Sequence, residues 1–242
     1  AEYNPFETVK TNIIGGQNVI EACIDNNVQR VVALSTDKAA NPVNLYGATK
    51  LASDKLFIAG NSYAGGRSTK FSVVRYGNVL GSRGSVLPLF LEQRLKGELT
   101  ITEPDMARLW IKMGKAISLV EKAFVTMQAG EIYVPKIPSM KMTDFAKALA
   151  PKAKVNVVGI RPGEKMHEIM IPADDARHTL EYQDHYRILP EFLHWQAPEN
   201  DSGKAVAPEF CYSSETNKEY LSVEDLIETA RAVAAECGIA YE

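Results

Sequence analysis

The sequence contains little cysteine, no long apolar run and no large excess of either charge. Its three cysteines, Cys23, Cys211 and Cys237, are odd in number and far apart, so neither a disulfide framework nor a zinc site is indicated. No apolar run approaches the ~18 residues that a membrane-spanning helix needs. The net charge of -3 gives no reason to expect nucleic acid or an anionic membrane as a partner. We expect a cytoplasmic protein without a bound metal.

The sequence also lacks a Gly-x-Gly-x-x-Gly turn after a strand, the pattern that binds the pyrophosphate of a dinucleotide. The pairs Gly15-Gly16 and Gly65-Gly66 and the run Gly81-Ser-Arg-Gly84 have the wrong spacing or setting. With 242 residues, 45% hydrophobic and 24% charged, the chain is nevertheless long and apolar enough for one or two globular domains.

Residues 31–50 carry the clearest functional signal in the sequence. Val31–Leu34 is a short, mostly β-branched apolar run, which predicts a buried strand, and Ser35-Thr36 follow at its carboxyl end, where open α/β sheets bind ligands. Beyond Pro42 the pattern becomes helical, and Tyr46 and Lys50 are four residues apart, so they share a face of the predicted helix. An ammonium beside a phenol favours the phenolate by ~1 to 3 pKa units. Tyr46 is therefore a candidate base.

The Tyr-x-x-x-Lys spacing alone is weak, because a chain with 10 tyrosines can contain such a pair by chance. In its context of a strand, a Ser-Thr end and a helix, the arrangement resembles the short-chain dehydrogenase/reductase superfamily. That resemblance implies that Tyr46 is the acid/base, that Lys50 holds the nicotinamide ribose, and that the Ser/Thr hydroxyl orients the substrate.

Four longer segments narrow the resemblance. STDKAANPVNLYGATK, RYGNVLGSRGSVLP, GEIYVPKIPSMKMTDFAKA and GIRPGEKMHEIMI are similar to the inverting UDP-N-acetylglucosamine 4,6-dehydratases of pseudaminic acid and related bacterial glycan pathways. The similarity extends from Tyr3 to about Tyr186. In that family the coenzyme's glycine turn precedes the counterpart of Tyr3. The sequence is therefore expected to lack the opening part of the catalytic subunit and to be inactive alone.

The resemblance implies an α/β fold with an incomplete Rossmann-like parallel sheet and a smaller substrate lobe. Residues 1–82, with a strand at 130–136 returning to the sheet, are expected to form the coenzyme domain. Residues 83–129 and 137–242 are expected to form the sugar-nucleotide lobe and the C-terminal segment. Similar enzymes are homo-oligomers.

The implied chemistry requires oxidation at C4 and then loss of water across C5 and C6. By resemblance, Tyr46 takes the C4 hydroxyl proton, Thr36 orients the sugar, Lys38 is the base for C5 and Asp37 serves C6. The coenzyme is NADP, with NAD also possible, and its contacts are expected to be Leu34, Ser35, Tyr46, Lys50 and Val79. The UDP-sugar contacts are expected to be Asn78, Arg83, Gly84, Ser85, Val86, Thr100, Arg161 and Glu164.

Ordinary structural roles compete with several of these assignments. Asp37 and Lys38 could form a solvated ion pair, Asn78 could cap its own turn, and Ser85 could cap the next helix. Arg161 and Glu164 flank a Pro-Gly pair, which favours a type II turn whatever they bind. Two other functions stay open, a UDP-sugar 4-epimerase, which needs Tyr46 and Lys50 alone, and a non-catalytic fragment that binds no coenzyme.

Hydrophobic spacing predicts the remaining elements. We expect a helix from Pro5 to about Asn26, strands at Lys70–Tyr76 and Leu99–Thr102, and a helix that opens at Arg108 and runs to about Phe124. Another helix is expected over Ser139–Ala150, a strand over Lys154–Ile160, a hairpin of the substrate lobe near Asp184–Leu193, a loop over Ala197–Pro208 and a last helix capped by Ser222.

Overall fold

The computed structural model describes residues 1–191, 201–239 and 241, and divides the chain into two compact units. The first unit consists of Ala1–Tyr76, Gly114–Lys136 and Ile169–Tyr212, and the second of Gly77–Met113, Ile137–Glu168 and Ser213–Glu242. The segment expected as substrate lobe is thus shared between the units, because Ile169–Tyr212 belongs to the first. No described helix has the length and hydropathy of a membrane span.

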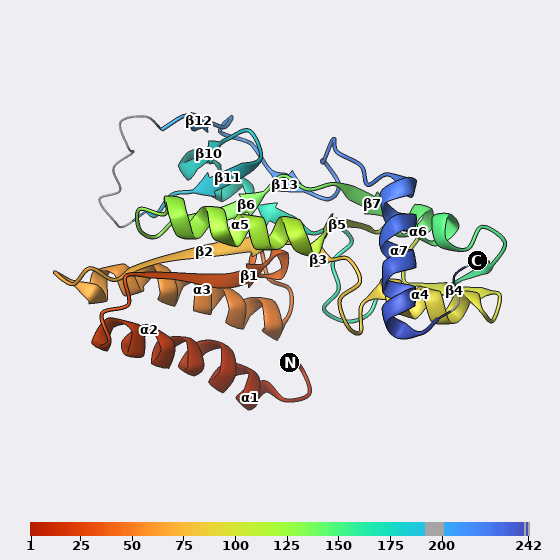
Figure 1. Cartoon of the computed structure of the whole chain (residues 1–242), viewed down its shortest axis with the longest axis horizontal. Helices are drawn as coiled ribbons and strands as arrows, with labels where there is room; N and C mark the ends of the chain where they lie inside the picture. Colours follow the sequence, from red (N-terminus) through yellow and green to blue (C-terminus); the bar gives the residue numbers. More distant parts are fainter. Residues whose placement is uncertain (192–200, 240, 242) are drawn as a thin grey trace. The chain divides into compact units, whose positions relative to one another are not determined.

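The first unit is a six-stranded sheet with helices on both faces (Figure 1). The strand order is β1-β2-β6-β11-β10-β12, in which β1, β2 and β6 are parallel and the other three pair antiparallel. The strands are β1 (Arg30–Thr36), β2 (Lys70–Tyr76), β6 (Ile132–Pro135), β10 (Thr179–Glu181), β11 (His185–Ile188) and β12 (Lys204–Ala205). This arrangement confirms the predicted α/β class and the return of the strand near 132 to the sheet.

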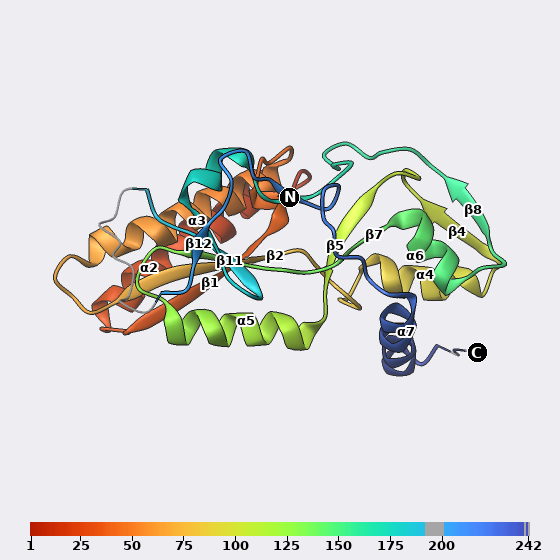
Figure 2. The ribbon, with the colours of Figure 1, turned by 90° about the horizontal axis from the view of Figure 1, so that it is seen from above.

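Helices α3 (Leu45–Ala64) and α5 (Met113–Thr126) lie on opposite faces of this sheet, as the views in Figures 1 and 2 both show. Phe71 packs toward α3, where its ring lies 6.2 Å from that of Phe57, whereas Val74 packs toward α5 with Leu119 and Ala123. Alternate residues of β2 thus serve alternate faces, as strand geometry requires.

A second helical segment packs along α3. The helix predicted from Pro5 is present as α1 (Pro5–Val9), a π turn (Lys10–Ile14) and α2 (Gly15–Asp25). Gly60 of α3 allows close contact here, since a Cβ on it would lie 3.1 Å from Ile20 and from Phe71. The short elements of the unit are the 3-10 helices η2 (Asp37–Ala39) and η3 (Ala173–His178), and the strand β9 (Ile169–Ile171).

The second unit encloses its own apolar core, in which the ring of Phe145 stacks on Trp110 at 4.7 Å. Its strands are β3 (Asn78–Val79), β4 (Glu98–Ile101), β5 (Ala107–Ile111), β7 (Ser139–Lys141) and β8 (Lys154–Val157). Its helices are α4 (Val86–Arg94), α6 (Met142–Leu149) and α7 (Val223–Cys237), and β13 (Tyr212–Ser213) lies where the chain passes from one unit to the other. Ser222 caps α7 as predicted, accepting from Asp225 N at 3.0 Å.

The prediction of a helix opening at Arg108 is wrong. Residues 107–111 form β5, which pairs with both β3 and β7, and Leu109, Trp110 and Ile111 are all buried. A consecutive apolar run of this length fits a strand covered on both faces, and the helix begins only at Met113. The buried face of that helix carries Ala116, Leu119 and Ala123, whereas Ile117 is exposed.

Two other boundaries also differ. The helix expected from Ser139 begins at Met142, because residues 139–141 pair with β5, although Met142, Phe145 and Leu149 do form its buried face. The hairpin expected near Asp184 is formed by β10 and β11, and it extends the sheet of the first unit instead of the substrate lobe. The end of that expected segment and the start of the Ala197–Pro208 loop fall in residues 192–200, outside the described residues.

Candidate active site

The predicted catalytic stretch lies where β1 ends and α3 begins, both within the first unit. Strand β1 runs parallel to β2, with Ser35 opposite Arg75 and Thr36 opposite Tyr76. The chain then forms the single turn η2, in which Thr36 Oγ1 accepts from Lys38 N at 3.4 Å. The polar residues 35–38 are therefore presented together at the carboxyl edge of the sheet, as the sequence predicted.

Successive side chains at the end of β1 point to opposite faces of the sheet. Ser35 is 5% exposed, and its Oγ donates to Asp54 Oδ2 of α3 at 2.7 Å. Thr36 is half-buried, and its Oγ1 donates to Asp37 Oδ1 at 2.8 Å. The two hydroxyls of the Ser-Thr pair thus serve different partners, and only that of Thr36 joins the Asp37-Lys38 pair.

Asp37 and Lys38 form an ion pair at the turn, with 3.0 Å between Lys38 Nζ and Asp37 Oδ1. The Asp37 side chain is fully buried, whereas that of Lys38 is 33% exposed. Asp37 Oδ2 is also buried, and no described residue donates a hydrogen bond to it. The pair is therefore not the solvated loop ion pair that an ordinary surface role would give, since its carboxylate is removed from water.

Helix α3 begins beside this turn and carries the predicted Tyr46 and Lys50. Asn44 caps the helix, with its side chain accepting from Gly47 N at 2.8 Å. Lys50 Nζ donates to the carbonyl of Leu34 at 2.7 Å, so the ammonium is held at the end of β1. Tyr46 is 38% exposed. Lys50 is thus placed by a backbone acceptor, and Tyr46 is open to a ligand.

A second phenol lies near Tyr46. Burial raises the pKa of Tyr76, and the nearby Tyr46 raises it further. Because a raised pKa keeps a phenol protonated at neutral pH, Tyr76 is unsuited to act as a base there.

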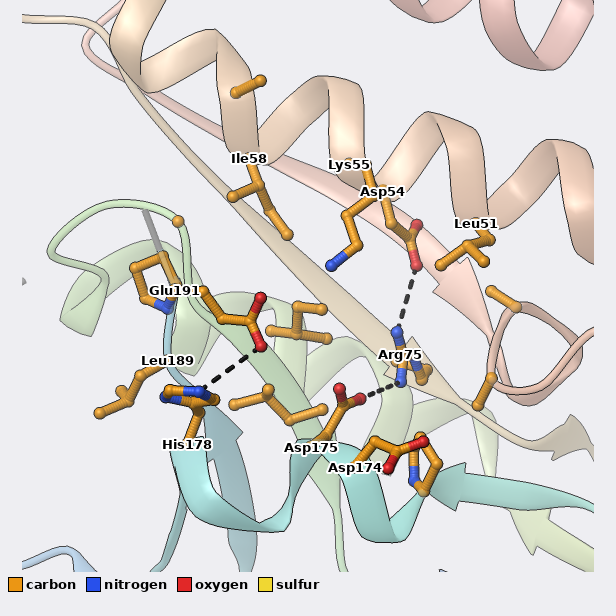
Figure 3. Close-up of a pocket in the computed structure, with 18 of the residues that line it drawn as sticks. Leu51, Asp54, Lys55, Ile58, Arg75, Asp174, Asp175, His178, Leu189 and Glu191 are labelled. Carbon is orange, nitrogen blue, oxygen red and sulfur yellow. Dashed lines mark ion pairs between the residues drawn. The ribbon is translucent and has the colours of Figure 1, made fainter. Parts of the chain in front are cut away.

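The described structure encloses a cavity of about 510 Å³ in the first unit (Figure 3). Its walls come from the loop after Lys38, from α3, from β6 and η3, and from residues 188–191. Thr36, Lys38 and Tyr46 are not among the described residues that line it. The cavity therefore adjoins the loop after Lys38, and it is distinct from the predicted catalytic site at Thr36, Lys38 and Tyr46.

The expected UDP-sugar contacts all lie in the second unit, together with Val79. Asn78 Nδ2 donates to the carbonyl of Leu109 at 3.3 Å, which holds its side chain against β5. Thr100 lies on β4, and its N–H is bound by Gln93 Oε1 at 2.9 Å. Asn78 on β3 and Thr100 on β4 therefore lie on edge strands of the unit's small sheets.

The segment Arg83–Val86 leads into α4. Arg83 is exposed, and Gly84 has φ +75°, a left-handed conformation that favours glycine. Ser85 stands at the N-cap position, but the predicted cap is wrong in its bonding, because the hydroxyl makes no cap hydrogen bond. Ser85 Oγ is buried, and no described residue partners it. The prediction of an ordinary capped turn therefore does not hold.

The Arg161–Glu164 turn is present as predicted. Glu164 N donates to the Arg161 carbonyl at 3.0 Å, and Gly163 has the positive φ of +78° that a type II turn requires. Glu164 Oε2 also accepts from Arg161 N at 3.1 Å, so this carboxylate stabilises the turn itself. The Arg161 side chain is exposed.

Sequence reasoning missed two residues that contact the carboxyl end of β1 or its neighbour, Asp54 of α3 and Arg75 of β2. Asp54 is 2% exposed, pairs with Arg75 Nη2 at 3.5 Å and accepts from Ser35. A signal was present, because Asp54 follows Lys50 by four residues and so extends the Tyr46-Lys50 face of the helix.

The family model described as "Polysaccharide biosynthesis protein" matches residues 1–190 of the chain. The chain belongs to this family. It is 51% identical over 238 residues to the UDP-N-acetylglucosamine 4,6-dehydratase (inverting) of Campylobacter jejuni, an alignment that covers 94% of this chain and 71% of that protein.

One further relative is named for a different activity. The UDP-glucose 4-epimerase of Rickettsia canadensis is 42% identical over 192 residues, covering 77% of this chain and 56% of that protein. Among solved structures, Pen from Bacillus thuringiensis superposes with a TM-score of 0.85 at 34% identity, covering 99% of this chain and 72% of Pen. These matches confirm the resemblance to inverting dehydratases and the Rossmann-like fold, and they leave dehydratase and epimerase activities to be separated by chemistry.

The closest approach at the site predicts the effect of one substitution. A Cβ on Gly47 would lie 2.1 Å from the carbonyl oxygen of Lys38. Gly47→Ala should therefore displace the turn that carries Asp37 and Lys38 and destabilise the fold by about 2 kcal/mol or more, as overpacking does. The measurement is the free energy of unfolding in urea. Gly114→Ala is the control, since nothing lies within 4 Å of its Cβ, and equal stability of the two variants would contradict the close approach.

Proposed function

We propose that the chain provides the catalytic groups of an NADP-dependent UDP-N-acetylglucosamine 4,6-dehydratase that inverts C5, in the synthesis of pseudaminic acid or another bacterial surface glycan. The observation that carries the proposal is the Asp37-Lys38 ion pair, which measures 3.0 Å and has a buried carboxylate. It lies beside α3, whose first turns carry Tyr46 and Lys50. Similarity to the Campylobacter jejuni dehydratase and to the polysaccharide biosynthesis family supports it.

The residues present fit the nicotinamide end of the coenzyme. Lys50 carries three N–H donors, one of which is bound by the Leu34 carbonyl, so two can reach a ribose. Tyr46 is exposed beside it, and Val79 and the backbone at Leu34 and Ser35 are the other proposed contacts. When bound, NADP⁺ supplies the hydride acceptor for C4 and the reduced form returns the hydride to C6.

The redox half of the reaction needs a base at the C4 hydroxyl. Tyr46 Oη takes that proton, Thr36 Oγ1 hydrogen-bonds the same region of the sugar, and Lys50 stabilises the phenolate. The resulting C4 ketone makes the C5 proton acidic enough for a side-chain base to remove.

The elimination half needs one base and one acid. Lys38 Nζ removes the C5 proton, and Asp37 gives a proton to the C6 hydroxyl, so the C6–O bond breaks and water leaves. Moving one proton from Nζ to the carboxylate converts the ion pair into the amine and acid that this step requires. Lys38 then protonates C5 from the opposite face, which inverts that carbon.

The UDP portion is proposed to bind the second unit. Arg161 presents an exposed planar guanidinium suited to a diphosphate, and Glu164 is placed beside it by the turn. Asn78, Thr100 and the segment Arg83–Val86 complete the proposed UDP-sugar contacts, and we propose that the active form is a homo-oligomer.

Residues 1–242 should bind NADP⁺ weakly on their own, because they contain no pyrophosphate-binding glycine turn. Isothermal calorimetry should detect little heat of NADP⁺ binding. An assay of product formation should detect little turnover. The control is the extended chain, by which we mean residues 1–242 preceded by the coenzyme-binding segment of the Campylobacter jejuni relative. Tight binding by residues 1–242 alone would show that another segment holds the coenzyme.

Lys38→Ala in the extended chain should separate the two halves of the reaction. Oxidation of C4 should persist because Tyr46 and Lys50 remain, whereas dehydration should fall by roughly 10² to 10⁴, the usual contribution of a general base. Absorbance of the reduced coenzyme follows the first half, and product mass follows the loss of water. Lys70→Ala, an exposed lysine at the start of β2, is the matched control. Product release at the parent rate would exclude Lys38 as the C5 base.

The stereochemical outcome tests the whole assignment. The extended chain is incubated with UDP-N-acetylglucosamine and NADP⁺ in heavy water, and the product is examined by proton NMR. We expect one deuterium at C5, the L-arabino configuration and a C6 methyl group. A D-xylo product would contradict inversion and leave a retaining dehydratase, whereas an unchanged C6 hydroxymethyl group would exclude dehydration and favour the epimerase.

A further inference from the structure

Asp54 is a buried carboxylate to which the proposed reaction assigns no role. It lies on α3 one turn after Lys50 and is 2% exposed. Burying a charge is costly unless it is paired and hydrogen-bonded. Asp54 has both kinds of partner, since it accepts from Ser35 Oγ at 2.7 Å and lies 3.5 Å from Arg75 Nη2.

The partners of Asp54 come from two neighbouring strands at one level of the sheet. Ser35 is the register partner of Arg75 in the parallel β1–β2 pair, so both side chains face α3 at the same height. Asp54 therefore links α3 to the carboxyl ends of both strands. The next register pair, Thr36 and Tyr76, faces the other way and lies at the catalytic edge.

Arg75 extends this contact to the wall of the cavity. Its Nη1 donates to the carbonyl of Met170 at 3.0 Å and lies 3.9 Å from Asp175 of η3. Figure 3 shows Arg75 between the carboxylates of Asp54 and Asp175. The side chains of Arg75 and Asp54 are each 3% exposed, so their contact is buried.

The charge of Asp54 depends on these neighbours. Burial raises the pKa of its carboxyl, while Arg75, the Ser35 hydroxyl and Lys50 each act to lower it. Lys50 is the same ammonium that is held by the Leu34 carbonyl. Asp54 thus hydrogen-bonds to Ser35 at the end of β1 and interacts electrostatically with Lys50 on α3.

We propose that Asp54 is a positioning residue whose carboxylate, held by Ser35 and Arg75, fixes the end of β1 against α3. The junction so fixed keeps Lys50 on the Leu34 carbonyl and keeps the turn with Asp37 and Lys38 at one distance from Tyr46. The catalytic consequence rests on the proposed function, whereas the anchoring itself does not.

The anchoring is tested by amide hydrogen exchange on residues 1–242. Ser35→Ala removes the donor and leaves the carboxylate, and Asp54→Asn removes the charge. Both should speed exchange in peptides that cover residues 34–42 by roughly tenfold or more, the size expected when a hydrogen bond to a buried charge is lost. Exchange in α7 should not change. Asp174→Asn is the matched control, an exposed carboxylate of the same cavity. Unchanged exchange at 34–42 in both variants would overturn the proposal.

The catalytic consequence is tested in the extended chain with C4-deuterated UDP-N-acetylglucosamine. Ser35→Ala should lower kcat about tenfold, leave the KM of the sugar nucleotide within threefold and increase the deuterium isotope effect, because hydride abstraction becomes slower relative to other steps. A smaller folded fraction would lower the rate and leave the isotope effect unchanged. The Ser35→Ala, Asp54→Asn double variant should be no slower than Asp54→Asn, since both changes break one contact.

Three outcomes separate this proposal from its rivals. An unchanged isotope effect would show that the contact is structural only and would overturn the positioning role. A raised KM for NADP⁺ with an unchanged isotope effect would mean that Ser35 acts on the coenzyme, which also overturns it. If the parent extended chain forms no dehydrated product, the proposed function fails, and the exchange result alone decides whether Asp54 anchors β1.

Discussion

The register of β1 against β2 is the constraint on which the catalytic end of the first unit depends. Seven residue pairs fix it, and the last two are Ser35 with Arg75 and Thr36 with Tyr76. A slip of β1 by one residue would exchange the faces on which Ser35 and Thr36 lie. The hydroxyl of Thr36 would then point toward α3, and Ser35 would stand in its place at the edge. The buried carboxylate of Asp54 opposes such a slip, because it would lose the hydrogen bond from Ser35.

The approach of α3 to the turn η2 is a second constraint that follows from the first. Once Lys50 is held by the Leu34 carbonyl, the first turn of the helix must pass close to the loop after Lys38. Gly47 permits this, since any side chain there would overlap the Lys38 carbonyl. The glycine in the Tyr-Gly-Ala-Thr-Lys segment is therefore required by packing, independently of any contact with a ligand.

The sequence predicted most of this junction because its signals are local. The β-branched run before Ser35 and the four-residue spacing of Tyr46 and Lys50 each determine structure over a few residues, and β1, β2 and α3 were found where those patterns lie. The sequence predicts a helix from Arg108 because Leu109, Trp110 and Ile111 show no alternation, and only pairing with β3 and β7 makes these residues a strand. The sequence also does not show the contact of Asp54 with Ser35 and Arg75. This contact joins residues from three elements, and local patterns carry no signal for it.

Under the proposed function, the Asp37-Lys38 pair serves a dehydration that an epimerase does not carry out. An epimerase moves a hydride at C4 and needs no second acid and base, so Tyr46 and Lys50 would be sufficient. Here the chain also buries a carboxylate completely and leaves its Oδ2 without a partner among the described residues, an arrangement that costs free energy of folding. An epimerase would bear that cost without using it. In a dehydratase the unpartnered oxygen is a place for the proton that C6 requires, and the adjacent amine of Lys38 is the base for C5. Under the proposed function, the free energy spent on burying Asp37 is therefore part of the mechanism.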